Sequence, residues 1–242
     1  MPEPHAAARG APWFARMRLP SLCALCRQWG SERLCADCIA LHAAPRPRCR
    51  RCALPAGDGG CGACVIDPPD FDGAVAAVDY GYPFDALIRR YKFHAGLDLT
   101  ATFARRMLAA HARAGLPSPG LLLPVPLSAQ RLRERGYNQA WELARRLGRA
   151  LGVPSDARLL LRIRDTPQQL DLPPEQRAAN VRGAFAIEPA RRAELRGAAV
   201  TVVDDVLTTG ATLREVARVL RQAGAAQVHV WTLARTPRPE TA

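Results

Sequence analysis

The sequence predicts an α/β fold, in which a mainly parallel β-sheet with helices on both faces follows a small metal-binding module. Two observations carry this prediction. After residue 70, short apolar runs alternate with segments of helical periodicity, a pattern typical of a parallel sheet that is covered on both faces. Before residue 70, eight cysteines fall in a segment too short to fold around a core of its own. We therefore expect an N-terminal extension over residues 1–20, a cysteine-rich module over 21–66 and a larger domain over 71–242.

The first half of the larger domain follows a proline-rich break at residues 67–70. An apolar run predicts a strand over 74–80. Apolar residues at helical spacing predict helices over 84–94 and 100–113, and a second apolar run predicts a buried strand over 121–125.

The second half continues the alternation. The apolar spacing predicts a helix over 137–151 and a strand over 159–163, and a proline near its first turn favours a short helix over 173–181. A strand over 199–203, a helix over 212–223 that stops at Gly224, and a last strand over 228–233 complete the prediction.

The cysteines form two copies of one unit, C-x2-C-x8-C-x2-C, offset by 26 residues. Each copy supplies the four thiolates that a tetrahedral Zn²⁺ ion prefers, and four cysteine ligands leave no position for water, so we expect two structural zinc ions. The candidate ligands are Cys23, Cys26, Cys35 and Cys38 in the first copy and Cys49, Cys52, Cys61 and Cys64 in the second. A disulfide framework and an iron–sulfur cluster are the alternatives, and cross-braced ligation between the copies stays open.

Composition excludes several classes of protein. Apolar residues make up 48% of the chain and charged residues 23%, which is ordinary for a globular protein, and no apolar run reaches the length of a membrane span. The first 22 residues lack the apolar core of a secretory signal, so we expect a cytoplasmic protein. The formal net charge of +12 suits polyanions, either nucleic acid or a small phosphorylated substrate.

One segment, Val200 to Thr212, indicates a ligand more directly. An apolar strand leads to two adjacent acids, Asp204 and Asp205, and a hydroxyl- and glycine-rich turn then opens a helix. The first N–H groups of a helix are unpaired and favour an anion, so this turn can hold a phosphate without a lysine, while the acids can accept hydrogen bonds from sugar hydroxyls. The candidate phosphate-binding residues are Thr208, Thr209, Gly210, Ala211 and Thr212. The alternative is an ordinary capped helix beside two exposed acids.

This segment resembles the phosphoribosyl-pyrophosphate signature of type I phosphoribosyltransferases. Several further motifs together resemble the ComF/GntX family of competence-associated proteins, in which a double zinc ribbon precedes a type I phosphoribosyltransferase-like domain. These motifs are the cysteine module, Tyr91-Lys92-Phe93, Pro124-Val125-Pro126-Leu127, the run from Arg131 to Gln139, Thr166-Pro167-Gln168 and Arg177-x-x-Asn180-Val181.

The resemblance implies a set of roles. Asp204 and Asp205 would bind the ribose 2′ and 3′ hydroxyls, and the turn after them the 5′-phosphate. The pyrophosphate, which enters with Mg²⁺, needs basic partners, and two groups can supply them: Arg131, Arg133 and Arg135 after one strand, and Arg162 and Arg164 at the end of another. From these we single out Arg131 and Arg164, together with Gln168. The polar stretch over 165–175 has the composition of a lid, and in the family resembled the corresponding loop closes over the pyrophosphate. Lys92, the sole lysine in the chain, is either a further phosphate ligand or a surface residue at the end of a helix.

Two functions from different classes follow. In the first, the chain is a phosphoribosyltransferase that binds phosphoribosyl pyrophosphate, or a related phosphorylated sugar, and transfers ribosyl phosphate to an unidentified acceptor with release of pyrophosphate. In the second, it is a non-catalytic accessory factor of DNA uptake that binds single-stranded DNA or uptake proteins. Single-strand binders usually stack bases on aromatic side chains, and only 6% of this chain is aromatic, which favours the first function.

Overall fold

The structure is a computed structural model that describes residues 20–57, 61–166 and 176–237. The predicted N-terminal extension, apart from its last residue, lies outside the described residues, and so does most of the predicted lid. Within the described ranges, no helix combines the length and the apolar character that crossing a membrane requires.

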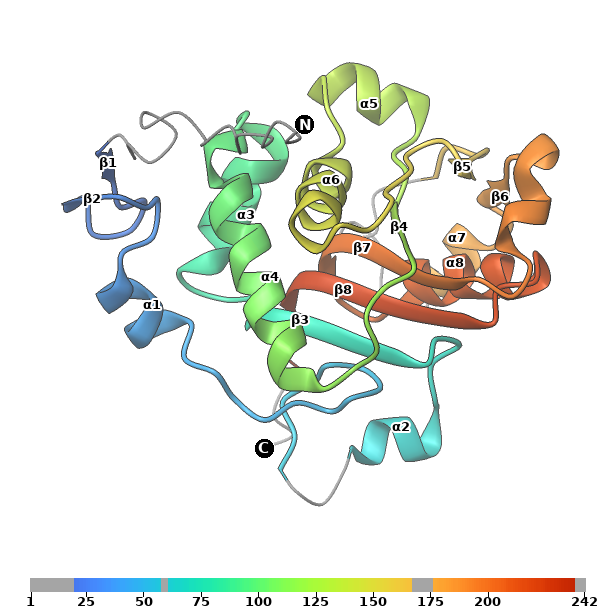
Figure 1. Cartoon of the computed structure of the whole chain (residues 1–242), viewed down its shortest axis with the longest axis horizontal. Coiled ribbons are helices and arrows are strands. Elements are labelled where there is room, and N and C mark those ends of the chain that lie inside the picture. Colours follow the sequence, from blue (N-terminus) through green and yellow to red (C-terminus); the bar gives the residue numbers. More distant parts are fainter. Residues whose placement is uncertain (1–19, 58–60, 167–175, 238–242) are drawn as a thin grey trace, which may run out of the picture.

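The centre of the fold is a four-stranded parallel sheet in the order β3-β8-β7-β4 (Figure 1). Its strands are β3 (Gly73–Asp79), β4 (Leu121–Pro124), β7 (Ala199–Leu207) and β8 (Gln227–Arg235). The two long strands pair in the middle, from Ala199 opposite Gln227 to Leu207 opposite Arg235. Because all four strands run in the same direction, their carboxyl ends meet at one edge of the sheet, where ligands of such folds bind.

Helices cover both faces of this sheet, as the sequence predicts. One face carries α3 (Phe84–Phe93), α4 (Thr100–Ala114) and α6 (Gln139–Leu151), which share an apolar cluster with Trp231 and Leu233 of β8. The other face carries α7 (Arg177–Val181) and α8 (Ala211–Gln222), which cluster with Val228 and Val230. Successive side chains of a strand point to opposite faces, so β8 contributes to both halves of the core.

Two differences from the predicted strands stand out. The predicted strand over 159–163 is β5 (Leu160–Arg162), and it pairs with β6 (Phe185–Ile187) in a separate antiparallel sheet rather than joining the central one. Strand β6 was not predicted from the sequence. In addition, β7 continues through the two acids to Leu207, because β8 is also longer than predicted and supplies hydrogen-bond partners along its whole length.

Most predicted helices are confirmed with small shifts at their ends. Helix α6 begins at Gln139 rather than at residue 137, because the Asn138 side chain accepts hydrogen bonds from the N–H groups of Ala140 and Trp141 and so caps the helix. A short unpredicted helix, α5 (Ala129–Arg135), is capped in the same way by Ser128. Two unpredicted 3₁₀ segments, Leu97–Leu99 and Pro189–Leu195, complete the larger domain. The predicted start of the helix over 173–181 lies outside the described residues.

The cysteine-rich segment contains β1 (Ser21–Leu22), β2 (Trp29–Gly30), α1 (Ala36–His42) and α2 (Gly62–Ile66). Its two units lie at different places on the larger domain (Figure 1). Cys23 and Cys38 of the first unit belong to the apolar cluster of α3, α4 and α6, whereas Cys52 and Cys64 of the second form a small cluster with Leu54.

The sulfur atoms group as the repeat predicts. In each unit the four sulfur atoms lie within 4.8 Å of one another, so each group of four comes from one copy of the repeat. The sulfur atoms of Cys26 and Cys35 are 3.6 Å apart, and those of Cys52 and Cys61 are also 3.6 Å apart. Four sulfurs at about 2.3 Å from one zinc ion lie roughly 3.8 Å from each other, so both groups fit tetrahedral zinc. All eight cysteines are free of disulfide bonds.

We predict that the purified chain contains two zinc ions. Elemental analysis and native mass spectrometry should both give a ratio of two per chain, and Cys38→Ser should lower it to one, because each four-sulfur group holds its own metal. A parent protein with one zinc, or with iron in place of zinc, would contradict the assignment.

Candidate functional site

A pocket opens at the carboxyl ends of β7 and β4, beside the first turn of α8. Its lining joins segments that are distant in the sequence. They are Tyr80, Lys92, Phe93, Val125, Pro126, Leu127, Arg131, Arg135, Gln139, Arg162 and the continuous run from Asp204 to Leu213. The pocket therefore contains both predicted acids, the whole predicted phosphate turn and two of the predicted basic residues.

The phosphate turn connects β7 to α8. Gly210 has a φ of +87°, a conformation that a glycine adopts without strain, and it places the start of α8 directly after the turn. The Thr209 hydroxyl accepts a hydrogen bond from the N–H of Ala211 at 3.5 Å. A helix that begins in this way presents its first N–H groups and the positive end of its dipole to the pocket, so an anion is favoured there.

The two acids have different surroundings because β7 continues through them. Neighbouring residues of a strand point to opposite faces, so the two side chains point away from each other, and Asp205 points toward Lys92 of α3. The Asp205 side chain is buried, and its Oδ1 lies 3.0 Å from Nζ of Lys92. Its other oxygen, Oδ2, is buried and has no hydrogen-bond partner among the described residues.

Asp204 is the acid whose pKa is shifted. Burial and the adjacent Asp205 carboxylate raise the pKa of Asp204 to about 7, although Lys92 and the N–H of Asp205, which donates to Oδ1 at 2.8 Å, act in the opposite direction. At neutral pH this carboxyl group therefore exchanges between its protonated and ionised forms, while it lines the pocket.

Lys92 points into the pocket rather than along the protein surface. The backbone next to Lys92 is held by a residue outside α3, because the Tyr137 hydroxyl donates a hydrogen bond to the carbonyl oxygen of Tyr91. The Tyr91 hydroxyl in turn donates to the carbonyl of Gln139 at 3.3 Å. The segment of Tyr137 and Gln139 thus holds the end of α3 in place, and Lys92 reaches Asp205 from there.

Three arginines line the pocket, and two of them, Arg131 and Arg162, are held together by one residue and form its basic wall. Arg131 donates to the carbonyl oxygen of Thr166 at 2.7 Å, and Arg162 donates to the hydroxyl of the same residue at 2.5 Å. Burial, and next the positive charge of Arg131, lower the pKa of Arg162 to about 10, so it stays charged at neutral pH. Two guanidinium groups held close together favour a ligand with several negative charges.

Of the other two predicted pyrophosphate ligands, Arg164 is not brought into the pocket. Arg164 is exposed and donates to the carbonyl oxygens of Asn180 and Arg182, at 3.2 and 2.5 Å. It is absent from the pocket lining among the described residues. Gln168 lies outside the described residues, so its predicted role and that of the lid stay predictions.

Eleven lining residues were not among the predicted site residues, and four of them are polar: Tyr80, Arg135, Gln139 and Arg162. The sequence indicated a basic residue here, because Arg162 and Arg164 both lie at the end of the predicted strand over 159–163. Only the direction of the chain after β5 decides which of the two lines the pocket. Gln139 is part of the family motif, and in the structure it is buried at the first residue of α6.

The pKa of Asp204 gives a prediction about stability. The pKa of Asp204 in the folded protein, about 7, exceeds the pKa of about 3.9 expected in the unfolded chain, so the folded protein holds this proton more tightly. The free energy of unfolding therefore falls as pH rises from about 4 to 7. Asp204→Asn removes this loss. Its gain in unfolding temperature over the parent should grow across that range and then level off, by roughly 2–4 °C for each kcal/mol.

Asp156→Asn is the matched control, because the pKa of Asp156 is shifted in the other direction. Burial acts to raise it, but hydrogen bonds from Arg191 and from the N–H groups of Arg158 and Leu159 outweigh burial and lower it. Removing that carboxylate should therefore cost stability as pH rises. A thermal melt series in which Asp204→Asn differs from the parent by the same amount at every pH would refute the raised pKa.

Comparisons with known proteins agree with this geometry. The phosphoribosyl transferase domain family matches residues 134–241, which include the acids and the phosphate turn. Glutamine phosphoribosylpyrophosphate amidotransferase from B. subtilis, a solved structure, is 21% identical and has a TM-score of 0.40. The match covers 60% of this chain and 30% of that one.

Two relatives match over a much larger share of the sequence. Competence protein F of Haemophilus influenzae is 36% identical over 179 residues, which cover 72% of this chain and 78% of that protein. The DNA utilization protein YhgH of Salmonella typhi is 35% identical over 232 residues, which cover 91% of this chain and 99% of that protein. With this similarity along nearly its whole length, two four-cysteine units and a phosphoribosyltransferase-like domain, the chain belongs to the ComF/GntX family.

Proposed function

We propose that the pocket binds phosphoribosyl pyrophosphate and that the chain transfers its ribosyl phosphate to an acceptor. One observation carries the proposal: a single pocket combines a phosphate turn at a helix start, two carboxyl groups at the end of a strand, and a basic wall of Arg131 and Arg162. A sugar that carries a phosphate at one end and a pyrophosphate at the other needs these three features in one place.

Each part of the ligand has a matching part of the protein. The 5′-phosphate lies in the turn from Thr208 to Thr212, and the ribose hydroxyls donate to Asp204 and to the unpaired Oδ2 of Asp205. The pyrophosphate, which enters bound to Mg²⁺, faces Arg131 and Arg162. The ammonium group of Lys92, 3.0 Å from Oδ1, balances the charge of Asp205.

The transfer itself requires no protein nucleophile. The bond from C1 of the ribose to the pyrophosphate oxygen breaks, and its electron pair leaves with the pyrophosphate, whose charge the two arginines stabilise. A lone pair on an acceptor nitrogen forms the new bond to C1, and that nitrogen releases its proton. Asp204, with a pKa of about 7, is suited to take a proton at neutral pH. The predicted roles of Arg164 and Gln168 at the pyrophosphate remain part of the proposal.

A double substitution tests the sugar-binding role of the acids. Asp204→Asn with Asp205→Asn keeps the size of both side chains but weakens the hydrogen bonds that they accept from ribose hydroxyls. At ~1.5–3 kcal/mol for a bond to a charged group, against roughly 1 for a neutral one, affinity for phosphoribosyl pyrophosphate should fall by about tenfold to a few hundredfold. Inorganic phosphate occupies only the turn, and it should bind more tightly once two negative charges are gone. Calorimetry at pH 8, where Asp204 is ionised, measures both.

The control removes two acids outside the pocket. Glu188→Gln with Glu194→Gln changes the net charge by the same amount, and neither residue lines the pocket. It should leave the affinity for phosphoribosyl pyrophosphate within about twofold of the parent. If the Asp204/Asp205 variant also binds this ligand like the parent at matched salt and Mg²⁺, the acids do not bind a sugar and the assignment fails.

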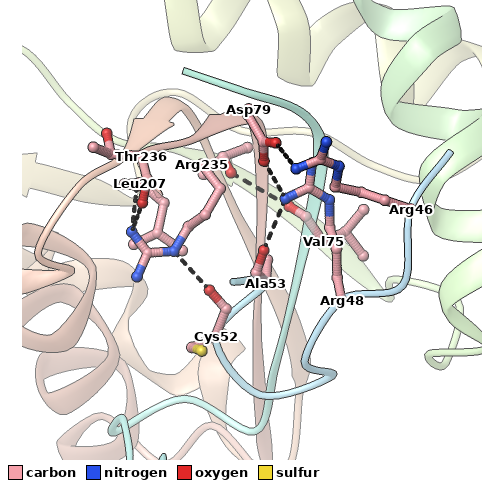
Figure 2. A network of polar contacts seen from close by, with 10 residues as sticks. Arg46, Arg48, Cys52, Ala53, Val75, Asp79, Leu207, Arg235 and Thr236 are labelled. Atoms are coloured by element: carbon pink, nitrogen blue, oxygen red, sulfur yellow. Dashed lines mark hydrogen bonds and ion pairs between the residues drawn. The ribbon is translucent and has the colours of Figure 1, made fainter. Parts of the chain in front are cut away.

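A separate cavity favours the second function, DNA binding. It has a volume of about 440 Å³, lies between the segment that joins the two cysteine units, strand β3 and helix α4, and shares no lining residue with the main pocket. Four arginines line it: Arg46, Arg48, Arg50 and Arg113. Figure 2 shows Arg46 and Arg48 both turned toward Asp79. The Nη1 atoms of the two arginines lie 2.6 and 2.8 Å from the carboxylate oxygens of Asp79. One carboxylate therefore pairs with two guanidinium groups, and the cavity keeps an excess of positive charge.

The hypothesis that this arginine-lined cavity binds DNA can be tested separately. Arg46→Gln with Arg113→Gln should weaken binding of an oligothymidine strand and flatten the plot of log affinity against log salt by about 1.4, which is roughly 0.7 for each lost phosphate contact. Arg145→Gln with Arg149→Gln on α6 is the control of equal charge. If the two variants lose affinity equally in fluorescence anisotropy, the binding is non-specific and the cavity is not a DNA site.

A further inference from the structure

The phosphate turn separates two cavities. Thr209 and Gly210 line the main pocket on one side and, on the other, a small cavity of about 70 Å³. Cys52 and Cys64, two of the predicted zinc ligands, line the far wall of that small cavity. The second cysteine unit therefore lies directly behind the turn that would hold the 5′-phosphate.

Arg235, at the end of β8, joins the unit to the turn. Its side chain is buried, its Nε donates to the carbonyl oxygen of Cys52 at 2.9 Å, and its Nη1 donates to the carbonyl oxygen of Leu207 at 2.8 Å. Nη1 also donates to the carbonyl of Thr208, the first residue of the turn. Figure 2 shows the guanidinium group between Cys52 on one side and Leu207 on the other.

Arg214 makes a second connection, from the first turn of α8. Its guanidinium group lies 2.8 and 3.1 Å from the two carboxylate oxygens of Asp67, and it also donates to the carbonyl oxygens of Asp67 and Pro68, each at 3.0 Å. Asp67 directly follows α2, the helix that carries Cys64. Two arginines thus hold the turn and the helix after it to the same cysteine unit.

We infer that metal binding by the second cysteine unit positions the phosphate turn, with Arg235 and Arg214 as the positioning residues. A metal that binds Cys52 and Cys64 fixes the backbone at both cysteines, and therefore the carbonyl of Cys52 and the chain that leads to Asp67. Arg235 in turn holds the carbonyl groups of Leu207 and Thr208 on the side of the turn that faces the cysteine unit. Because a trans peptide is planar, its N–H group points away from its carbonyl group, and so toward the pocket. The inference rests on the proposed function only in naming what the turn binds.

The first cysteine unit provides an internal control. It has the same sequence pattern, but it packs into the cluster of α3, α4 and α6 rather than behind the turn. The hydrogen bonds of Arg235 and Arg214 described above all reach the second unit, its following segment, or the turn itself. Loss of metal from the first unit should therefore leave the turn unchanged, although the two sites are chemically alike.

Hydrogen exchange in the ligand-free protein tests this difference. Cys61→Ser and Cys35→Ser alter the same position of the two repeats, and each should remove one zinc, as metal analysis verifies. Cys61→Ser should make the amides of residues 207–212 exchange on the order of tenfold faster, while Cys35→Ser leaves them like the parent. Unchanged exchange in Cys61→Ser after proven loss of zinc, or an equal increase in both variants, overturns the inference.

A second pair of variants keeps both zinc ions and so avoids general unfolding. Arg214→Gln removes the connection to Asp67, and Arg218→Gln, one turn further along α8, removes only a pair with Glu215 on the same helix. Exchange at 207–212 should rise about threefold or more in Arg214→Gln and stay unchanged in Arg218→Gln. Equal exchange in the two variants contradicts the positioning role. Since no ligand is present, these results hold whether or not phosphoribosyl pyrophosphate binds, and a titration of each variant with inorganic phosphate then shows whether a loosened turn binds less.

Discussion

The structure depends on the parallel pairing of β7 with β8. This pair runs the full length of both strands, and three functional elements are attached to its carboxyl end. Asp204 and Asp205 are residues of β7, the phosphate turn continues from the end of β7, and Arg235 is the last residue of β8, opposite Leu207. Because the register fixes where each strand ends, it also fixes the distance between the carboxyl groups, the start of α8 and the buried guanidinium group. A shift of one residue would exchange the faces to which the acids point.

Charge compensation in the pocket follows from that register. Asp205 points toward α3 and is paired with Lys92, while Asp204 points the other way and keeps a proton at a higher pH. Two identical neighbouring side chains thus have different surroundings, and the difference comes from the alternation of a strand rather than from the residues themselves. On the opposite wall, Arg131 and Arg162 are held through one residue, Thr166, which brings two positive charges together at the place where a pyrophosphate would lie.

The central strands, the long helices and both cysteine units could be predicted from the sequence, because apolar periodicity and cysteine spacing are local signals. Three features could not. Strand β6 is three residues long and is stabilised by its partner β5, so its own sequence carries little information. The choice between Arg162 and Arg164 depends on the path of the chain after β5. Arg235 looks like an ordinary charged residue at the end of a strand, and its role arises from the carbonyl of Cys52, 183 positions away. Local patterns predict elements, whereas contacts across the fold decide what those elements hold.

The proposed function requires that this pocket recognise a sugar with a phosphate at one end and a pyrophosphate at the other. Calorimetric titration of the parent protein tests it most directly, with phosphoribosyl pyrophosphate and Mg²⁺ compared with ribose 5-phosphate and inorganic phosphate at the same salt and pH. We expect one binding site per chain, with affinity that falls from phosphoribosyl pyrophosphate to ribose 5-phosphate to inorganic phosphate, as first the basic wall and then the two acids lose their contacts. Equal affinities for the three ligands, or no binding of phosphoribosyl pyrophosphate, would contradict it.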